Sequence, residues 1–122
     1  MKHKKQKNID KRYIRGIVAE FQTINILKRQ KYEILHHRFQ HLNGEIDIIA
    51  KDNNELVAVE VKHRQTYRTI RCVKIKQRKN IKKTLSYFLE QYHEYKKYSI
   101  RFDVVLFAAK YRQYAHLKGA FK

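Results

Sequence analysis

The chain has 122 residues, of which 43% are hydrophobic and 12% aromatic, enough to bury the core of one domain. Its 29 Lys and Arg against 11 Asp and Glu give a formal net charge of +18, which indicates a polyanionic partner, nucleic acid first and an anionic membrane surface second. No run of about 18 apolar residues suits a membrane span, and residues 1–12 lack the apolar segment of a signal peptide. We therefore expect a cytoplasmic protein that does not enter a membrane.

The remaining composition favours one undivided domain. Cys72 is the single cysteine, so no internal disulfide is available. Proline is absent and glycine occurs only three times, so no flexible linker divides the chain. We expect a basic, disordered arm over residues 1–10 and one domain over residues 11–122.

In chain order, the first periodic segment predicts a helix, because its apolar residues share one helical face: Ile14, Ile17, Val18, Phe21, Ile24 and Leu27. Residues 33–39 indicate a strand that leads into a loop. Residues 45–50 and 55–62 alternate with strand period. Between them lies an Asn-Asn pair, which tolerates positive φ, so the two strands should form a hairpin.

The second half predicts one more helix and two more strands. A helix from the mid-seventies onward has its apolar face formed by Ile81, Leu85, Phe88, Leu89 and Tyr92. Residues 100–108 form a dense apolar strand, and residues 114–121 a weaker last one. The order helix, three strands, helix, two strands predicts an α/β single domain with a mixed sheet and flanking helices.

The predicted hairpin gathers acidic side chains. With a two-residue loop at 53–54, Asp47 lies directly across from Glu60; with a loop two residues longer, Glu45 takes that place and Asp47 is diagonal to Glu60. Both registers put Asp47, Glu60 and Lys62 on one face. Alternation within the first strand puts Glu45, Asp47 and Ile49 on that face, and Ile46, Ile48 and Ala50 on the other.

Two carboxylates in such positions require an explanation. Directly opposed Cβ atoms lie about 4.5 to 5.5 Å apart, where like charges destabilise a sheet unless something neutralises them. A divalent cation that prefers oxygen ligands, Mg²⁺ or Mn²⁺, would do so. The alternative interpretation is a solvated sheet face on which these acids pair with Lys and Arg, but the hairpin is apolar on both faces, which favours burial. Glu20 borders the apolar stripe of the first helix, and Gly16 one turn earlier leaves room for close approach, so this helix can deliver a third carboxylate.

These motifs, taken together, resemble a known family. The matching segments are RGIVAE (15–20), GEIDIIA (44–50), LVAVEVKHR (56–64), KQRKNI (76–81), RFDVV (101–105) and HLKGAF (116–121). The chain resembles the YraN family of endonuclease-like proteins in the PD-(D/E)xK nuclease superfamily, related to archaeal Holliday-junction resolvases. The resemblance implies a restriction-endonuclease-like fold. The chain departs from the family pattern at Arg38 and Gln40, where relatives usually carry Asn and Arg, and in the segment after residue 64.

The resemblance also implies roles for individual residues. Asp47 and Glu60 would bind Mg²⁺ or Mn²⁺ with the backbone carbonyl of Val61, and Glu20 would add a ligand from the helix. Lys62 would orient or deprotonate the attacking water and stabilise charge on the phosphate. Glu45 is either a supporting acid or a plain surface acid. For Gln77 a solvated helix position is favoured over contact with the site, and for Asp103 a structural hydrogen-bonding role over that of a ligand.

The basic residues are concentrated next to the predicted site. No acid occurs between Val61 and Leu89, whereas this stretch holds ten Lys and Arg. A charge run is often only a solvated face, but this one begins at Lys62, which favours a groove that follows the phosphate backbone. The expected nucleic-acid contacts are Arg64, Arg68, Arg71, Lys74, Lys76 and Gln77. Tyr67 is a candidate for stacking on an unpaired base, whereas the tyrosines of residues 87–98 favour core and rim positions.

The sequence therefore predicts a metal-dependent endonuclease that hydrolyses phosphodiester bonds, with DNA, branched or single-stranded, as the first candidate substrate. The alternative is a non-catalytic nucleic-acid-binding module on a nuclease fold. The choice between DNA and RNA, and homodimer formation as in junction resolvases, stay open at this point.

Overall fold

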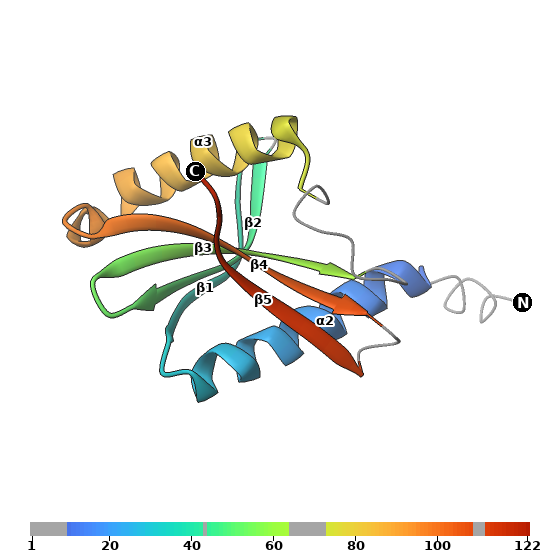
Figure 1. Cartoon of the computed structure of the whole chain (residues 1–122). Helices are drawn as coiled ribbons and strands as arrows, with labels where there is room; N and C mark the ends of the chain where they lie inside the picture. The colour runs from blue at the N-terminus through green and yellow to red at the C-terminus, as the bar shows by residue number, and fades with distance from the viewer. Residues whose placement is uncertain (1–9, 43, 64–72, 109–111) are drawn as a thin grey trace, which may run out of the picture.

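The computed structural model describes residues 10–42, 44–63, 73–108 and 112–122, which form one five-stranded sheet with a helix on each face (Figure 1). The elements are α2 (Lys11–Arg29), β1 (Glu33–His41), β2 (Gly44–Asp52), β3 (Glu55–His63), α3 (Ile75–Gln91), the 3₁₀ turn η2 (His93–Tyr95), β4 (Ser99–Ala108) and β5 (Gln113–Phe121). The predicted order of helices and strands is confirmed. Apart from Asp10, the predicted arm falls outside the described residues and stays a prediction.

The sheet has the strand order β1-β2-β3-β4-β5. All neighbouring strands are antiparallel except β3 and β4, which are parallel. A parallel pair needs a crossover connection, and α3 provides it over one face of the sheet. The predicted mixed sheet with an antiparallel hairpin and flanking helices is therefore present, and it is consistent with a restriction-endonuclease-like fold. No helix in the described part of the chain is long and apolar enough to span a membrane.

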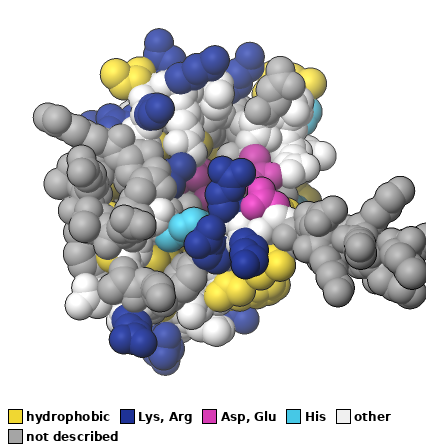
Figure 2. Space-filling model, turned by 90° about the vertical axis from the view of Figure 1, so that its right-hand side faces the viewer, with side chains coloured by type: hydrophobic (Ala, Val, Ile, Leu, Met, Phe, Trp, Pro, Cys, Tyr) yellow, Lys and Arg dark blue, Asp and Glu magenta, His cyan; other side chains and the backbone are white. Residues whose placement is uncertain are grey.

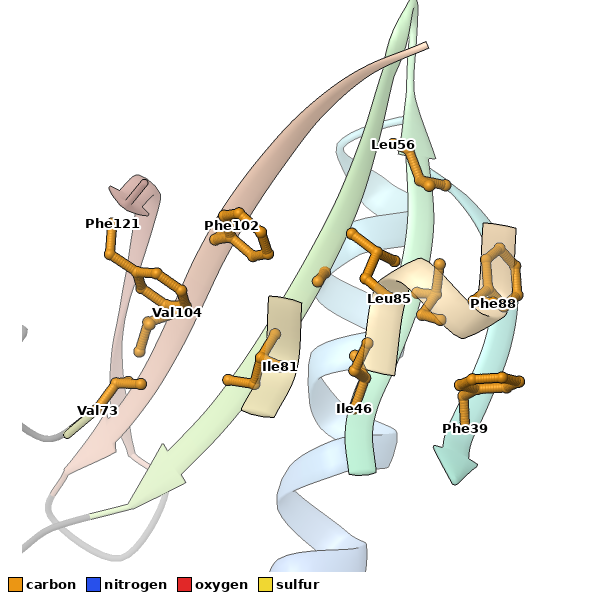
Figure 3. Close-up of a cluster of buried hydrophobic side chains, with 12 residues drawn as sticks. Phe39, Ile46, Leu56, Val73, Ile81, Leu85, Phe88, Phe102, Val104 and Phe121 are labelled. Carbon is orange, nitrogen blue, oxygen red and sulfur yellow. The ribbon is translucent and has the colours of Figure 1, made fainter. Parts of the chain in front are cut away.

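The face of the sheet under α3 carries the larger apolar cluster (Figure 3). Ile81, Leu85 and Phe88 point from α3 toward the sheet, as their helical spacing predicts. The ring of Phe88 meets that of Phe39 edge to face, with centroids 5.2 Å apart. The strands contribute Ile46, Ile49, Leu56, Ala58, Phe102, Val104 and Phe121 to the same cluster.

The opposite face packs against α2. Ala19, Ile26 and Leu27 are buried on the helix, with Ala19 and Leu27 fully inaccessible. They belong to one cluster with Ile48, Ala50, Val57, Val59, Val105 and Phe107 of the sheet. Because both faces are covered, the central strands are apolar on both sides, and the predicted buried hairpin is confirmed.

Of the two hairpin registers that the sequence allows, the structure has the one with the shorter loop. Asp52 pairs with Glu55 and Ile48 pairs with Val59, so only two residues form the loop. Asn53 has a positive φ of 54°, a conformation that Asn adopts more readily than most residues.

The predicted alternation of side chains between the two faces of the sheet is wrong at the start of β2. Ile46 packs with Ile49 in the cluster under α3, whereas Ile48 and Ala50 pack on the side of α2. The break coincides with Arg38 on the neighbouring strand, whose φ of 59° lies in the left-handed region. The first strand is also longer than expected, because residues predicted to form a loop pair with β2 as far as His41 and Gly44.

A buried ionic network joins β4 to β5 and to the hairpin turn. Asp103 is fully buried and accepts hydrogen bonds from Arg101 Nε at 2.8 Å and from Tyr32 Oη at 3.2 Å; its Oδ2 also lies 2.7 Å from His116 Nε2. Arg101 also pairs with Asp52 and Glu55. The predicted structural role of Asp103 is confirmed by these contacts.

Burial by itself raises the pKa of Asp103, but hydrogen bonds with His116, Arg101 and the backbone amide of Gly119 outweigh it and lower the pKa to about 2. Because this value lies below the ordinary 3.8, the ionised carboxylate stabilises the fold above about pH 4, and this contribution is lost as the pH falls toward 2.

Replacing Asp103 by Asn should therefore make the free energy of unfolding less dependent on pH under acidic conditions. The variant should be less stable at neutral pH, and should lose about 2 kcal/mol less than the wild type between about pH 5 and pH 2. Urea unfolding at a series of pH values measures both effects. If both proteins lost the same unfolding free energy over this pH range, the stabilising role of the ionised Asp103 carboxylate would be contradicted.

Candidate active site

The predicted site forms where β2 separates from β3. The paired ladder between the two strands ends at Ile48 and Val59, and the next residue, Asp47, instead accepts a hydrogen bond through Oδ2 from the backbone amide of Val61 at 2.9 Å. Asp47 and Glu60 are the next residues of the two strands beyond the last pair, and they lie close enough for the charge of Asp47 to raise the pKa of Glu60. The side chain of Asp47 thus reaches the backbone of β3 at the point where the strand pairing stops.

Glu60 is an acid enclosed by protein. Its residue is only 3% exposed, and its Oε1 has no hydrogen-bond partner among the described residues. Burial and the nearby charge of Asp47 raise the pKa of Glu60 well above its ordinary value, and burial also raises the pKa of Asp47. The two acids therefore form a pair that favours a proton or a cation in the site.

Lys62 supplies a positive charge beside this pair. Its charge opposes the rise in the pKa of both Asp47 and Glu60. Its Nζ donates a hydrogen bond to Oε1 of Gln77 on α3 at 3.1 Å. Gln77 is half-buried and bonded to the predicted catalytic lysine, so the solvated helix position favoured by the sequence is wrong.

Glu20 approaches the pair from α2, but its oxygens are bound to β1. Arg38 donates to Glu20 from Nε at 2.9 Å and from Nη2 at 3.2 Å, and His37 Nε2 lies 2.6 Å from Oε1. Glu20 still lies close enough for its charge to raise the pKa of Asp47. The predicted close approach at Gly16 is wrong, because a Cβ placed there would meet no atom of the described residues within 4 Å.

The residues present fit a divalent ion held by two carboxylates. Among the described residues, no set of three or more His, Cys, Asp and Glu side chains is arranged to hold a metal. Mg²⁺, however, commonly uses only one or two protein carboxylates and takes its other ligands from water and substrate phosphates. The unpartnered, buried Oε1 of Glu60 is an oxygen that such an ion would satisfy.

One face of the molecule carries acidic and basic side chains close together. Figure 2 shows a small group of acidic side chains near the middle of one face, bordered by Lys and Arg side chains and a His side chain. Lys74 and Lys76, at the start of α3, are exposed. Glu45 is exposed and accepts a hydrogen bond from Gln40 rather than joining the buried pair. The other predicted contacts lie outside the described residues: Arg64, Arg68, Arg71 and Tyr67.

Sequence reasoning missed two residues that the structure adds to this region, His37 and Arg38. Both side chains reach Glu20, although neighbours in a regular strand point to opposite faces. The positive φ of Arg38 makes this possible, and no residue-type preference announces it for Arg. Only the departure of position 38 from the family pattern marked it in the sequence.

Comparison with known proteins places the chain in a family. The profile described as "Uncharacterised protein family UPF0102" matches residues 19–107, which include Glu20, the whole hairpin and β4 as far as Phe107. The chain belongs to this family. The predicted YraN-type relationship is thereby confirmed at the level of UPF0102.

Relatives from distant bacteria match over most of their length. A UPF0102 protein of Ehrlichia ruminantium is 40% identical over 93 residues, which cover 76% of this chain and 72% of the relative. One from Acinetobacter baumannii is 37% identical over 95 residues, or 75% and 71% of the two chains. One from Caldicellulosiruptor saccharolyticus is 36% identical over 93 residues, or 74% and 78%.

Replacing Glu60 by Gln should stabilise the protein in a buffer that contains a chelator. Because the folded-state pKa of Glu60 is raised, ionising it costs stability as the pH rises above about 4.5, and Gln removes that cost. We expect a gain of about 1–2 kcal/mol at pH 8 and little gain at pH 4, measured by urea unfolding. Glu45→Gln, an exposed acid on the neighbouring strand, is the control and should show no such trend. A loss of stability at pH 8 on Glu60→Gln would contradict this description of the pair.

Proposed function

We propose that this protein is a metal-dependent endonuclease that hydrolyses phosphodiester bonds in nucleic acid, with DNA as the first candidate. The observation that carries the proposal is the buried Asp47–Glu60 pair, with Lys62 beside it, in a chain of net charge +18. A protein that only needs to fold gains nothing from two adjacent carboxylates in its interior. The resemblance of GEID, VEVKHR and RFDVV to PD-(D/E)xK nucleases supports the same conclusion.

In this proposal Asp47 and Glu60 hold a Mg²⁺ or Mn²⁺ ion, joined by the backbone carbonyl of Val61. When bound, such an ion polarises the scissile phosphate and lowers the pKa of a coordinated water. The hydrogen bond from the Val61 amide fixes one oxygen of Asp47, so its other oxygen faces the site in a constant orientation. Glu20 supports the site by its charge and holds His37 and Arg38.

Lys62 acts on the phosphate and on the attacking water. Its ammonium group offsets negative charge that develops on the phosphate oxygens, an effect that is strong in a site partly shielded from solvent. The hydrogen bond to Gln77 restricts the long side chain to one direction and leaves its other donors for substrate. Gln77 is thus a positioning residue for Lys62.

Basic residues would guide the nucleic acid to this site. Lys74 and Lys76 are exposed at the start of α3, less than one turn of helix from Gln77. Arg64, Arg68 and Arg71 are proposed from their sequence positions between Lys62 and α3. Such contacts attach to phosphates and carry no base sequence, so binding should weaken steeply as the salt concentration rises.

Cleavage tests the proposal directly. The purified protein should cut single-stranded, branched or duplex DNA with Mg²⁺ or Mn²⁺, and Asp47→Asn and Lys62→Ala should lower the rate at least about 100-fold. Binding in EDTA should survive both substitutions. Lys28→Ala, an exposed lysine in the last turn of α2, is the control and should cut at the wild-type rate. No cleavage of any DNA or RNA substrate with either ion would overturn the proposal.

Metal binding provides a second test that does not need a substrate. Mn²⁺ should raise the melting temperature of the wild type, because an ion that binds only the folded state stabilises it by mass action. Asp47→Asn should abolish most of this rise, whereas Glu45→Gln should keep it. A rise of equal size in all three proteins would place the ion elsewhere.

One observation favours a second candidate, a non-catalytic nucleic-acid-binding module. The third predicted carboxylate, Glu20, is bound by Arg38 and His37, which leaves two acids for a metal among the described residues. This candidate would be supported if the protein cleaved no nucleic acid but bound it tightly without a metal. Asp47→Asn should then bind as tightly as the wild type.

A further inference from the structure

A second concave site lies along the middle of α3, beyond the basic residues at the N-terminus of that helix. A cavity of about 150 Å³ opens between the β1–β2 turn and the middle of α3. A cavity of this volume in another protein holds one benzene molecule, so the space suits a single aromatic ring. Its lining includes His41, Leu42, Asn80, Lys83 and Tyr87.

The walls of this cavity are aromatic on one side. The rings of His41 and Tyr87 lie against each other in a tilted arrangement, with centroids 3.8 Å apart and an angle of 32° between their planes. Both side chains are half-buried, so the pair keeps an accessible surface. Leu42, in the turn, is 77% exposed, an unusual position for so large an apolar side chain.

The remaining lining groups are polar or basic. Asn80 and Lys83 are exposed on α3, and Lys83 carries a positive charge. Gly44 closes the base of the cavity, where a Cβ would overlap Oγ1 of Thr84. This close approach holds the start of β2 against α3 and forms the floor of the cavity.

The proposed active site and this cavity lie at two points along the same side of α3, with Thr84 buried against Gly44 between them. Gln77, Asn80, Thr84 and Tyr87 follow one another at intervals of three, four and three residues, which places them along one side of the helix. Gln77 binds Lys62 at one end of this row, and Tyr87 lies against His41 at the other. At 1.5 Å per residue the row is about 15 Å long, the length of about four stacked nucleotides.

We propose that this cavity binds one unpaired nucleobase of the nucleic acid whose backbone lies in the active site. The base stacks on the His41–Tyr87 pair, Leu42 covers its apolar edge, the amide of Asn80 faces its polar edge, and Lys83 contacts an adjacent phosphate. This inference rests on the proposed function and specifies its substrate. The substrate class is a nucleic acid with at least one unpaired nucleotide within about four nucleotides of the scissile phosphate.

The tyrosines of this region show why Tyr87 differs from its neighbours. Tyr92 and Tyr95 pack against Phe88, with ring centroids 4.6 and 6.0 Å apart, and Tyr95 contacts Tyr98. Those three therefore occupy the core and rim positions that the sequence favours. Tyr87 instead contacts His41 at the end of β1 and lines a cavity, so its half-buried rim position also places it beside an open space.

Binding in EDTA tests the proposal without any need for catalysis. Fluorescence anisotropy would compare a labelled single-stranded oligonucleotide with the same sequence as a duplex. Tyr87→Leu should bind the single strand about tenfold more weakly and the duplex unchanged, because stacking on an aromatic side chain is available only to an unpaired base. Tyr114→Leu, a 48% exposed tyrosine on β5, is the matched control and should bind both as the wild type does. Equal loss for single strand and duplex would overturn the proposal.

Photocrosslinking of the wild type provides a measurement that no folding defect can disturb. A single-stranded oligonucleotide that contains 5-iodouracil, irradiated with the protein, should crosslink to peptides that contain His41 or Tyr87. Crosslinks confined to other peptides would overturn the proposal.

The outcomes separate this inference from the proposed function. If Asp47→Asn abolishes cleavage but Tyr87→Leu keeps the wild-type preference for single strands, the base site is wrong and the nuclease stands. If Tyr87→Leu loses that preference but no metal supports cleavage, the base site is supported and the protein binds nucleic acid without cutting it.

Discussion

The separation of β2 from β3 after the Ile48–Val59 pair is the constraint on which the site depends. Antiparallel strands normally continue to pair, and here a carboxylate of one strand takes the backbone amide of the other instead. The two acids Asp47 and Glu60 are the next residues of these strands beyond the last pair. Side chains of both helices lie near these acids, since Gln77 of α3 binds Lys62 and the charge of Glu20 on α2 raises the pKa of Asp47.

This arrangement is costly, and the surrounding fold compensates for it. Two buried acids raise the free energy of the folded state unless a proton, metal or cation neutralises them. The clusters on the two faces of the sheet supply the apolar burial that keeps this region folded. The network around Asp103, in contrast, satisfies its carboxylate with Arg101, Tyr32 and His116, which suits a purely structural acid. One sheet thus contains two buried acids in different states, Asp103 with its hydrogen-bonding partners and Glu60 with an oxygen that has none among the described residues.

Much of the fold was predictable because it depends on short-range patterns. Helical periodicity marked α2 and α3, and alternation with an Asn-Asn turn marked the β2–β3 hairpin with two possible registers, of which the structure has the one with the shorter loop. The same local rule failed at Ile46, where alternation breaks, and at the end of β1, which pairs where a loop was expected. The break at Ile46 lies beside Arg38, whose positive φ accompanies contacts with Glu20 on a distant helix, and no local pattern announces such contacts.

The sequence by itself determined the elements, their order, and the placing of Asp47, Glu60 and Lys62 together, because residues in one hairpin are brought together by local geometry alone. Only the tertiary structure decided what reaches them from elsewhere. Gln77 binds Lys62, and Arg38 and His37 bind Glu20, because helices pack on a sheet at positions that no local pattern encodes. The cavity beside Tyr87 likewise exists because Gly44 lets β2 approach α3 closely, a contact between residues 40 positions apart.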